Sequence, residues 1–141
     1  DDDDETVYLQ ALAPPSLLAT DVVDLSFLQG QNTAPPPCRV WASRAGVSSP
    51  LHYDATDSHL VQIRGVKRML LWPPSALPGL DPIRGDHPLA RRCRADLAAR
   101  PGLLADAVEA VLRPGDALWF PKEWAHYTEA LDDAGDLSIS L

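Results

Sequence analysis

Three side chains able to bind a metal ion occur at a spacing that β-strands would bring together. His52 and Asp54 are two residues apart, so on a strand both point to one face while Tyr53 points to the other. An imidazole and a carboxylate on one face can bind a single ion if a third ligand comes from another strand. His126 is the natural candidate, because it lies where a late strand should begin, just after the corner at residues 121–124. The pattern predicts a metal site.

Two imidazoles and one carboxylate on one face of an octahedron leave three positions open, which is the ligand set of non-haem Fe(II) oxygenases. The pattern is weak by itself, since a His-x-Asp triplet often arises by chance and a single histidine at a strand start is commonly packed or solvated. Two other histidines compete. A regular strand would place His59 on the face opposite His52, and His87 lies in a proline-rich loop. The triad of His52, Asp54 and His126 is therefore preferred.

A lysine near the triad adds a second kind of chemistry. Lys67 lies in the strand predicted for residues 66–72, on the face that also carries Met69 and Leu71. If that face is the core, burying the ammonium is costly unless an anion meets it. The alternative is a side chain that snorkels at the strand end and keeps its charge in water. Beside a metal triad, an inward ammonium could bind the distal carboxylate of 2-oxoglutarate through a charge-assisted hydrogen bond.

The elements that must position these residues are short strands between turns, since 14 prolines and 8 glycines interrupt 141 residues. Strands are predicted at residues 7–10, 40–43, within 51–63, and at 66–72, 117–120, 124–131 and 137–141, with a turn at 46–50 and a tight reversal at 64–65. Apolar residues at helical spacing predict two helical stretches between about 89 and 112, separated at 101–102. The fold class that follows is mainly β, a double-stranded β-helix (cupin-like jelly roll) with a short helical insert.

Composition indicates one acidic domain. Acids outnumber bases 20 to 12, for a formal charge of −8. Residues 1–6 read as an acidic tail or linker, and residues 7–141 as a single domain. This balance argues against sequence-independent binding of nucleic acid. No apolar run approaches the roughly 20 residues that span a membrane, and no signal segment is evident. We therefore expect an intracellular protein, cytoplasmic or nuclear, that does not bind membranes.

Three smaller expectations complete the survey. Cys38 and Cys93 are far apart in the sequence, which favours two reduced thiols over a disulfide. The final strand stops at Leu141 without a turn or tail, so we expect a chain trimmed at its C-terminus. The four tryptophans could form a substrate cage, but their strand positions favour core packing; they are Trp41, Trp72, Trp119 and Trp124.

Four segments taken together resemble the JmjC/cupin-8 oxygenases. They are residues 49–54 (SPLHYD), 62–68 (QIRGVKR), 114–121 (PGDALWFP) and 124–126 (WAH). The likeness covers about residues 39–141 and is nearest to the asparaginyl hydroxylases and related protein and tRNA hydroxylases of that family. The interval of 15 residues from His52 to Lys67 matches that subgroup. Each segment is common, but the joint pattern is specific.

By position, the resemblance implies that His52, Asp54 and His126 bind Fe(II). It implies that Lys67 binds the C5 carboxylate of 2-oxoglutarate, the cosubstrate that is consumed together with O2. Affinity for the metal should then fall at acid pH, because both histidines must be neutral and the aspartate ionised.

Two further residues are implied as cosubstrate contacts, and two positions depart from the pattern. Ser49 stands three residues before the first ligand, where relatives carry Thr or Ser. Tyr8 would contribute a hydroxyl if the match at residues 8–10 holds; otherwise it is a packed surface tyrosine. Ser58 stands where the subgroup often has Asn, and the chain ends about where an Asn of the last strand would fall. Neither departure removes a ligand.

The implied activity is that of a dioxygenase, an oxidoreductase that decarboxylates 2-oxoglutarate to succinate and hydroxylates a protein side chain or a modified RNA base. A protein substrate is favoured over RNA. Demethylation of N-methyl-lysine is the alternative with the same chemistry. Two alternatives belong to other classes. Lys67 argues against a metal-binding cupin, such as an isomerase or a storage-type protein, because such a protein has no need of the ammonium. The complete triad argues against a non-catalytic cupin-like interaction domain, because such domains usually lose a ligand. Substrate identity and oligomeric state are left open.

Overall fold

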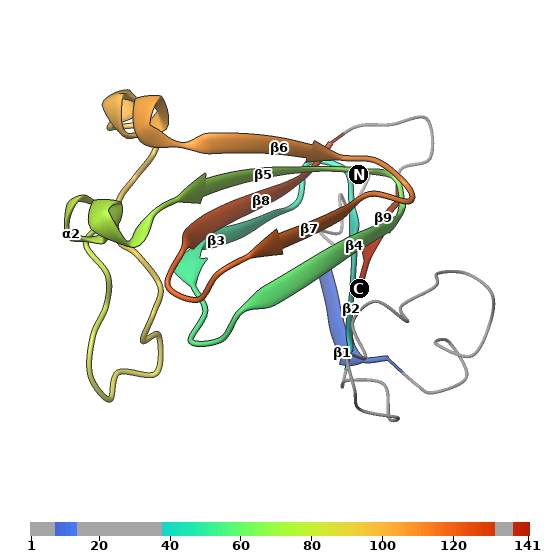
Figure 1. The fold of residues 1–141 in the computed structure, drawn as a ribbon, viewed down its shortest axis with the longest axis horizontal. Helices are drawn as coiled ribbons and strands as arrows, with labels where there is room; N and C mark the ends of the chain where they lie inside the picture. The colour runs from blue at the N-terminus through green and yellow to red at the C-terminus, as the bar shows by residue number, and fades with distance from the viewer. Residues whose placement is uncertain (1–7, 14–37, 132–136) are drawn as a thin grey trace, which may run out of the picture.

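A computed structural model of the protein describes residues 8–13, 38–131 and 137–141. The acidic run at residues 1–6 lies outside the described residues. The described residues form two antiparallel sheets that face each other (Figure 1). One sheet has the order β1 (Tyr8–Leu12), β2 (Arg39–Arg44), β9 (Leu137–Ser140), β4 (Ser58–Arg64), β7 (Ala117–Phe120). The other has the order β3 (Ser48–Tyr53), β8 (Ala125–Leu131), β5 (Val66–Trp72), β6 (Val108–Leu112).

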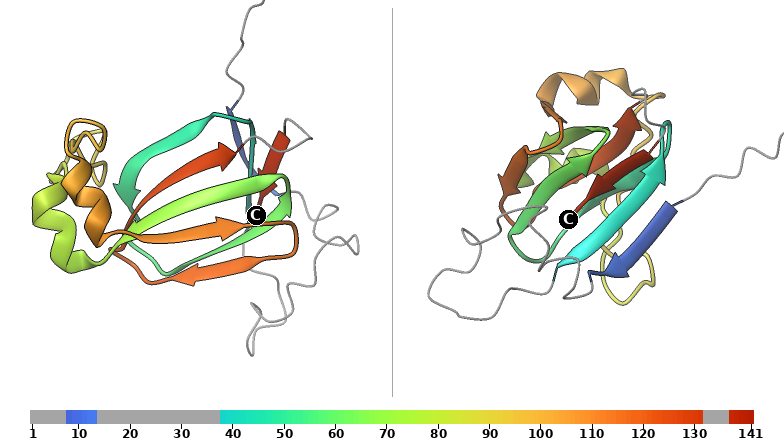
Figure 2. Two further views of the ribbon diagram at one scale, coloured as in Figure 1. Left: turned by 90° about the horizontal axis from the view of Figure 1, so that it is seen from above. Right: turned by 90° about the vertical axis from the view of Figure 1, so that its right-hand side faces the viewer.

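The chain passes repeatedly from one sheet to the other. From β2 to β5 every strand changes sheet, and from β6 to β9 every strand changes again. This alternation winds the two halves of the chain into one sandwich, which Figure 2 shows from above and from the side. The prediction of a mainly β, cupin-like jelly roll is confirmed. Figure 1 places the short helices together at one end of the sheets and β1 and β2 near the other.

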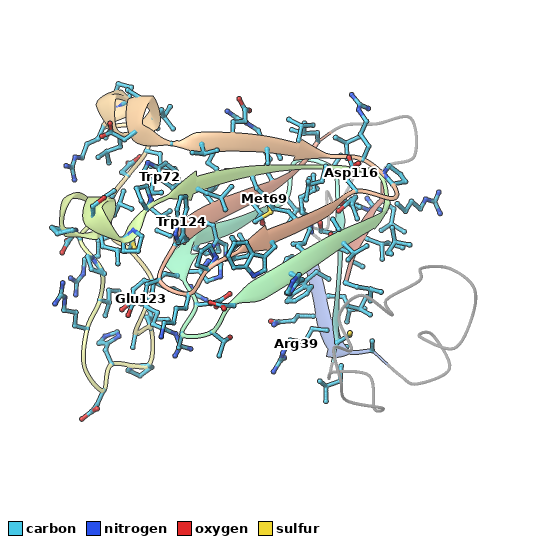
Figure 3. All side chains as sticks on the ribbon, viewed as in Figure 1. Arg39, Met69, Trp72, Asp116, Glu123 and Trp124 are labelled. Carbon is cyan, nitrogen blue, oxygen red and sulfur yellow. The ribbon has the colours of Figure 1, made fainter. Side chains whose placement is uncertain are left out.

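Apolar side chains of both sheets meet between them. Met69 is fully buried there with Leu60, Leu71, Leu112 and Phe120. Figure 3 shows Met69 in this central position. Alternation along each strand produces the arrangement, since side chains two apart share a face. The same alternation on β5 carries Lys67 inward with Met69 and Leu71.

A second cluster covers the outer face of the four-stranded sheet. Leu70, Trp72 and Ala125 pack there against Leu80. Leu80 belongs to the short helix α2 (Leu77–Leu80), which follows η2 (Pro74–Ala76). Trp72 also donates a hydrogen bond from Nε1 to the carbonyl oxygen of Leu103, 2.7 Å away, in η3 (Pro101–Asp106). The segment between β5 and β6 is therefore packed onto the sheet that carries the predicted site.

Part of the secondary-structure prediction was wrong in this segment. The stretch expected to be helical up to residue 112 contains only the six-residue 3-10 helix η3, and residues 108–112 form strand β6. The spacing of Val108 and Val111 fits a helix, but β6 pairs along its whole length with β5, and β-branched residues favour strands. The turn expected at residues 46–50 is also shorter, since β3 begins at Ser48.

The expectation of core tryptophans holds for Trp72, which is 0% exposed, and is wrong for Trp119, which is 55% exposed. Trp119 points outward because Phe120, its neighbour on β7, takes the inward position. Cys38 and Cys93 form no disulfide, as expected. No helix in the described part of the chain is long and apolar enough to cross a membrane.

The reversal between β4 and β5 is set by a glycine and a buried amide. Gly65 has a φ of 69°, and a Cβ there would lie 2.5 Å from the carbonyl oxygen of Leu137, so only glycine fits. Gln62 is 0% exposed, donates to Ser138 and accepts from Ser140. These contacts hold β4 and the reversal against β9. They therefore determine where β5 begins, and Lys67 follows two residues after Gly65.

Candidate metal centre and its cavity

The two histidines of the predicted triad lie on neighbouring strands. His52 on β3 and His126 on β8 are direct partners in the antiparallel register, and their ring centroids are 4.2 Å apart. Asp54 follows immediately after β3. One ligand atom from each residue lies within 4.8 Å of those of the other two. The structure thus brings together three residues from distant parts of the sequence as a group able to hold a metal ion.

Backbone carbonyl groups orient both imidazoles. Nδ1 of His52 lies 2.7 Å from the carbonyl oxygen of Pro50, and Nδ1 of His126 lies 3.0 Å from that of Trp124. A carbonyl oxygen can only accept, so Nδ1 of each ring is the donor. In the neutral form of each ring the lone pair is then on Nε2, which leaves this nitrogen available as a metal ligand.

Burial keeps His126 neutral. The residue is 4% exposed, and its pKa is lowered mainly by loss of solvation and secondarily by His52, against the opposing effects of the Trp124 carbonyl and Asp54. Its Nε2 lies 3.9 Å from Oδ2 of Asp54. Because the imidazole is neutral, this contact is better described as two potential ligands facing one point than as an ion pair.

Two loops carrying ligands are fastened to each other by a contact that sequence reasoning missed. The backbone N–H of Lys122 donates to Oδ1 of Asp57 at 2.9 Å, and that of Glu123 donates to the carbonyl oxygen of Asp54 at 2.9 Å. Glu123 has a φ of 66°, an uncommon conformation for a residue with a side chain. Figure 3 shows Glu123 and Trp124 at this corner. The clasp couples the position of Asp54 to that of His126.

Ser58, which stands where related sequences often carry Asn, also approaches the triad. Its Oγ donates to Oδ2 of Asp54 over 3.4 Å, a long and therefore weak hydrogen bond. In the sequence, only the place of Ser58 in the family pattern indicated this contact, because a serine near two acidic residues has no distinctive spacing.

Lys67 points inward, so the snorkelling alternative is wrong. The residue is 6% exposed, and burial lowers the pKa of its ammonium from 10.5 to about 8. No carboxylate in the described part of the chain forms a salt bridge with it. At neutral pH the side chain is a buried cation, a state that an incoming anion would stabilise.

The triad and Lys67 line one cavity of about 1080 Å³ between the sheets. Its wall also includes Tyr8 and Ser49, whose hydroxyl oxygens are 3.2 Å apart. The structure therefore brings together all of the residues that were predicted as metal or cosubstrate contacts. Tyr8 is 46% exposed, so it stands at the rim and is not buried in the wall.

The competing histidines are placed differently. His59 lines the cavity as well, but it does not belong to the group of potential metal ligands found among the described residues. His87 accepts a hydrogen bond at Nδ1 from the backbone of Leu89, 3.0 Å away, in an exposed turn.

A known protein family matches almost the whole chain. The family described as Cupin-like domain matches residues 3–141. The Jumonji C domain-containing protein 5 of Drosophila melanogaster is 33% identical over 109 residues, which cover 73% of this chain and 26% of the relative. The Lysine-specific demethylase JMJ31 of Arabidopsis thaliana is 28% identical over 149 residues, which cover 100% of this chain and 25% of the relative.

A solved structure is also similar to this chain, at lower sequence identity. The X-ray structure of E. coli ycfD has a TM-score of 0.47 and 20% identity, covering 72% of this chain and 24% of that one. The chain spans about a quarter of the length of the relatives and of the structure named here.

Proposed function

The chain belongs to the Cupin-like domain family, and on that premise we propose that it is an Fe(II)- and 2-oxoglutarate-dependent dioxygenase that hydroxylates a side chain of a protein substrate. One observation carries the proposal: a buried lysine, unmatched by any carboxylate of the described residues, shares a cavity with two imidazoles and a carboxylate. Each half of the site suits one component of that chemistry.

The donor set fits the metal. Two imidazoles with Nε2 facing the site and one carboxylate are the ligands used by non-haem Fe(II) oxygenases, and they leave coordination positions for other molecules. Fe(II), when bound, would supply activation of O2 coupled to decarboxylation of 2-oxoglutarate to succinate. In that state His52, Asp54 and His126 hold the metal, and the carbonyl oxygens of Pro50 and Trp124 keep both imidazoles oriented.

The remaining residues bind and orient. Lys67 binds the C5 carboxylate of 2-oxoglutarate through a charge-assisted hydrogen bond, because that anion removes the cost of its buried charge. The hydroxyl groups of Ser49 and Tyr8 can donate to the same ligand from the cavity rim. The apolar wall formed by Met69 and Phe120 excludes water from the reacting groups. The acidic balance of the chain favours a protein substrate over a nucleic acid.

Demethylation of N-methyl-lysine is a second candidate, favoured by the likeness to a lysine-specific demethylase across this whole chain. It needs the same metal and cosubstrate, and it differs only in that the hydroxylated carbon is an N-methyl group. A non-catalytic domain is the third, and it accounts poorly for a complete triad beside a buried lysine.

The test begins with binding under nitrogen. Calorimetry should show that the wild type binds Fe(II) and then 2-oxoglutarate, and that admission of air yields succinate. Asp54→Ala should lose the metal and with it succinate formation. Asp86→Ala, which removes an exposed carboxylate outside the cavity, is the matched control and should behave as the wild type. Succinate formation at the wild-type rate in Asp54→Ala would refute the proposed ligand set.

A further inference from the structure

The segment between α2 and residue 94 is held against the free edge of β3. Tyr53 donates from its backbone to Arg91 (3.1 Å), and Cys93 donates to Leu51 (2.8 Å). Arg92 pairs with His52 in an isolated β-bridge. An extra piece of strand thus lies beside the strand that carries the first metal ligand, and it brings two consecutive arginines to the cavity.

Hydrogen bonds to Ile83 fix the backbone conformation of these two arginines. Arg91 donates to the carbonyl oxygen of Ile83 (2.9 Å), and Ile83 donates back to Arg92 (2.7 Å). Arg91 has a φ of 74°, a left-handed conformation that glycine adopts more easily than arginine. An arginine kept in a conformation that favours glycine points to a use for its side chain.

Both arginines, together with Arg39 on β2, line the cavity. In Figure 1 the segment after α2 and strand β1 both extend below the other strands, at opposite ends of the view, and Figure 3 labels Arg39, the first residue of β2. Arg68 and Arg94 form salt bridges with acidic residues of the described part of the chain. Arg39, Arg91 and Arg92 do not belong to those pairs.

Charge at the cavity is opposite to that of the whole chain. Acids outnumber bases 20 to 12 in the sequence, yet the residues that line the cavity include four cationic ones (Arg39, Lys67, Arg91 and Arg92) and two acidic ones. Asp54 belongs to the triad and Asp57 accepts from Lys122. Lys67 is assigned to the cosubstrate. Arg39, Arg91 and Arg92 are therefore the cationic lining residues that have no role in the reaction proposed above.

We propose that Arg39, Arg91 and Arg92 bind an acidic peptide, so that the substrate is a protein segment rich in Asp and Glu around its target residue. The inference rests on the proposed function and names the substrate class of the same site. Arginine suits carboxylates because its planar guanidinium can donate two parallel hydrogen bonds. Three arginines in an otherwise acidic chain match a few carboxylates better than the continuous phosphates of RNA, which require a longer basic surface.

The experiment measures binding of labelled probes by fluorescence anisotropy, with no metal or cosubstrate added. The probes are a fluorescein-labelled peptide of alternating Glu and Ser, its Lys and Ser counterpart, and an oligouridylate of equal length. The wild type should bind the acidic peptide, more weakly as salt is added, and should not bind the basic one. Replacing Arg91→Gly together with Arg92→Gln should weaken binding about tenfold, since exposed charge pairs contribute up to about 1 kcal/mol each.

A stability measurement and a control variant separate a loss of binding from a loss of folding or of charge elsewhere on the surface. Arg91→Gly relieves the left-handed backbone, so thermal unfolding should show no loss of stability from that change. Arg84→Gln, on the same segment but outside the cavity wall, is the matched control and should bind within about twofold of the wild type.

Three outcomes would overturn the inference: the arginine variant binds the acidic peptide as the wild type does, both peptides bind alike, or the oligouridylate binds in preference and depends on the same arginines. The proposed function fails separately. Succinate formation without acidic-peptide binding would leave the dioxygenase and remove its substrate class. Arginine-dependent peptide binding in a chain that binds no 2-oxoglutarate would do the reverse.

Discussion

At one end of the cavity, His52, Asp54 and His126 are arranged by hydrogen bonds that the protein itself completes. At the other end, Lys67 is buried with no carboxylate of the described residues to balance its charge. The metal end is therefore arranged by hydrogen bonds, because each imidazole donates from Nδ1 to a backbone carbonyl oxygen and no donor is left unsatisfied there. At the lysine end, the buried ammonium destabilises the folded protein until an anion binds to it.

The difference shows that a residue of the cavity can lower the stability of the ligand-free protein while it raises the affinity for a ligand. A pKa lowered from 10.5 to about 8 corresponds to roughly 3 kcal/mol by which the folded state disfavours the charged lysine. That free energy is stored in the protein without ligand and is recovered when a carboxylate binds. The metal end has no comparably buried charge, since the Asp54 side chain is 40% exposed, so its contribution to affinity depends on how well its two loops are held.

The largest expected effect is on stability at the lysine end. Lys67→Met should raise the free energy of unfolding by about 3 kcal/mol at pH 7, because it removes a charge that is buried without a carboxylate partner among the described residues. The folded state releases the Lys67 proton near pH 8 and the unfolded state near 10.5. Wild-type stability should therefore be lowest below about pH 8 and rise relative to the variant between those values. Urea unfolding at several pH values measures this.

Lys122→Met is the matched control for that comparison, since Lys122 is exposed and its substitution should leave both stability and its pH dependence nearly unchanged. Equal unfolding free energies for Lys67→Met and the wild type would show that Lys67 is balanced by a partner, and the contrast between the two ends would disappear.

The next effect is on cosubstrate binding by the same variant. Lys67→Met should weaken 2-oxoglutarate binding roughly 10- to 100-fold, the loss expected for a charge-assisted hydrogen bond. Metal affinity should change by less than about twofold, because no triad residue depends on Lys67. Calorimetry with each ligand gives both values. A parallel loss of metal affinity would show that the two ends are not independent.

A smaller effect tests the clasp at the metal end. Asp57→Ala removes the acceptor of the Lys122 N–H and should weaken metal binding about fivefold, in line with one lost hydrogen bond of about 1 kcal/mol. Asp57→Asn keeps an acceptor oxygen and should restore most of that affinity. Titration with Co(II), followed by its absorption spectrum, reports affinity and ligand geometry together. Identical spectra and affinities in all three proteins would remove Asp57 from the positioning of the site.

The smallest effect is at the cavity rim. Tyr8→Phe should weaken 2-oxoglutarate binding about two- to fivefold, because a partly exposed hydroxyl contributes less than a buried charge. Ser49→Ala should act similarly, and the two losses should not add, since the hydroxyls contact each other. Tyr127→Phe, which packs on the outer cluster, is the control. Additive losses would indicate that each hydroxyl acts alone.

Much of the architecture followed from local pattern. The strand predicted at residues 66–72 agrees with β5 to the residue, and that at 117–120 with β7. Apolar alternation and flanking Pro and Gly define such strands without help from the rest of the chain. One of the failures was at residues 108–112, where two valines fit either periodicity and pairing with β5 decided for a strand.

The sequence by itself determined the residue types of the site, since His-x-Asp on a strand puts two ligands on one face and alternation with Met69 and Leu71 directs Lys67 inward. Only the tertiary structure decided what completes it. The β3–β8 register placed His126 beside His52, the clasp at Asp57 joined their loops, and the segment along β3 added Arg91 and Arg92 to the cavity. These contacts join segments that are distant in the sequence, through backbone pairing along β3 and through a backbone N–H that donates to the Asp57 carboxylate, and no local pattern in the sequence marks such partners.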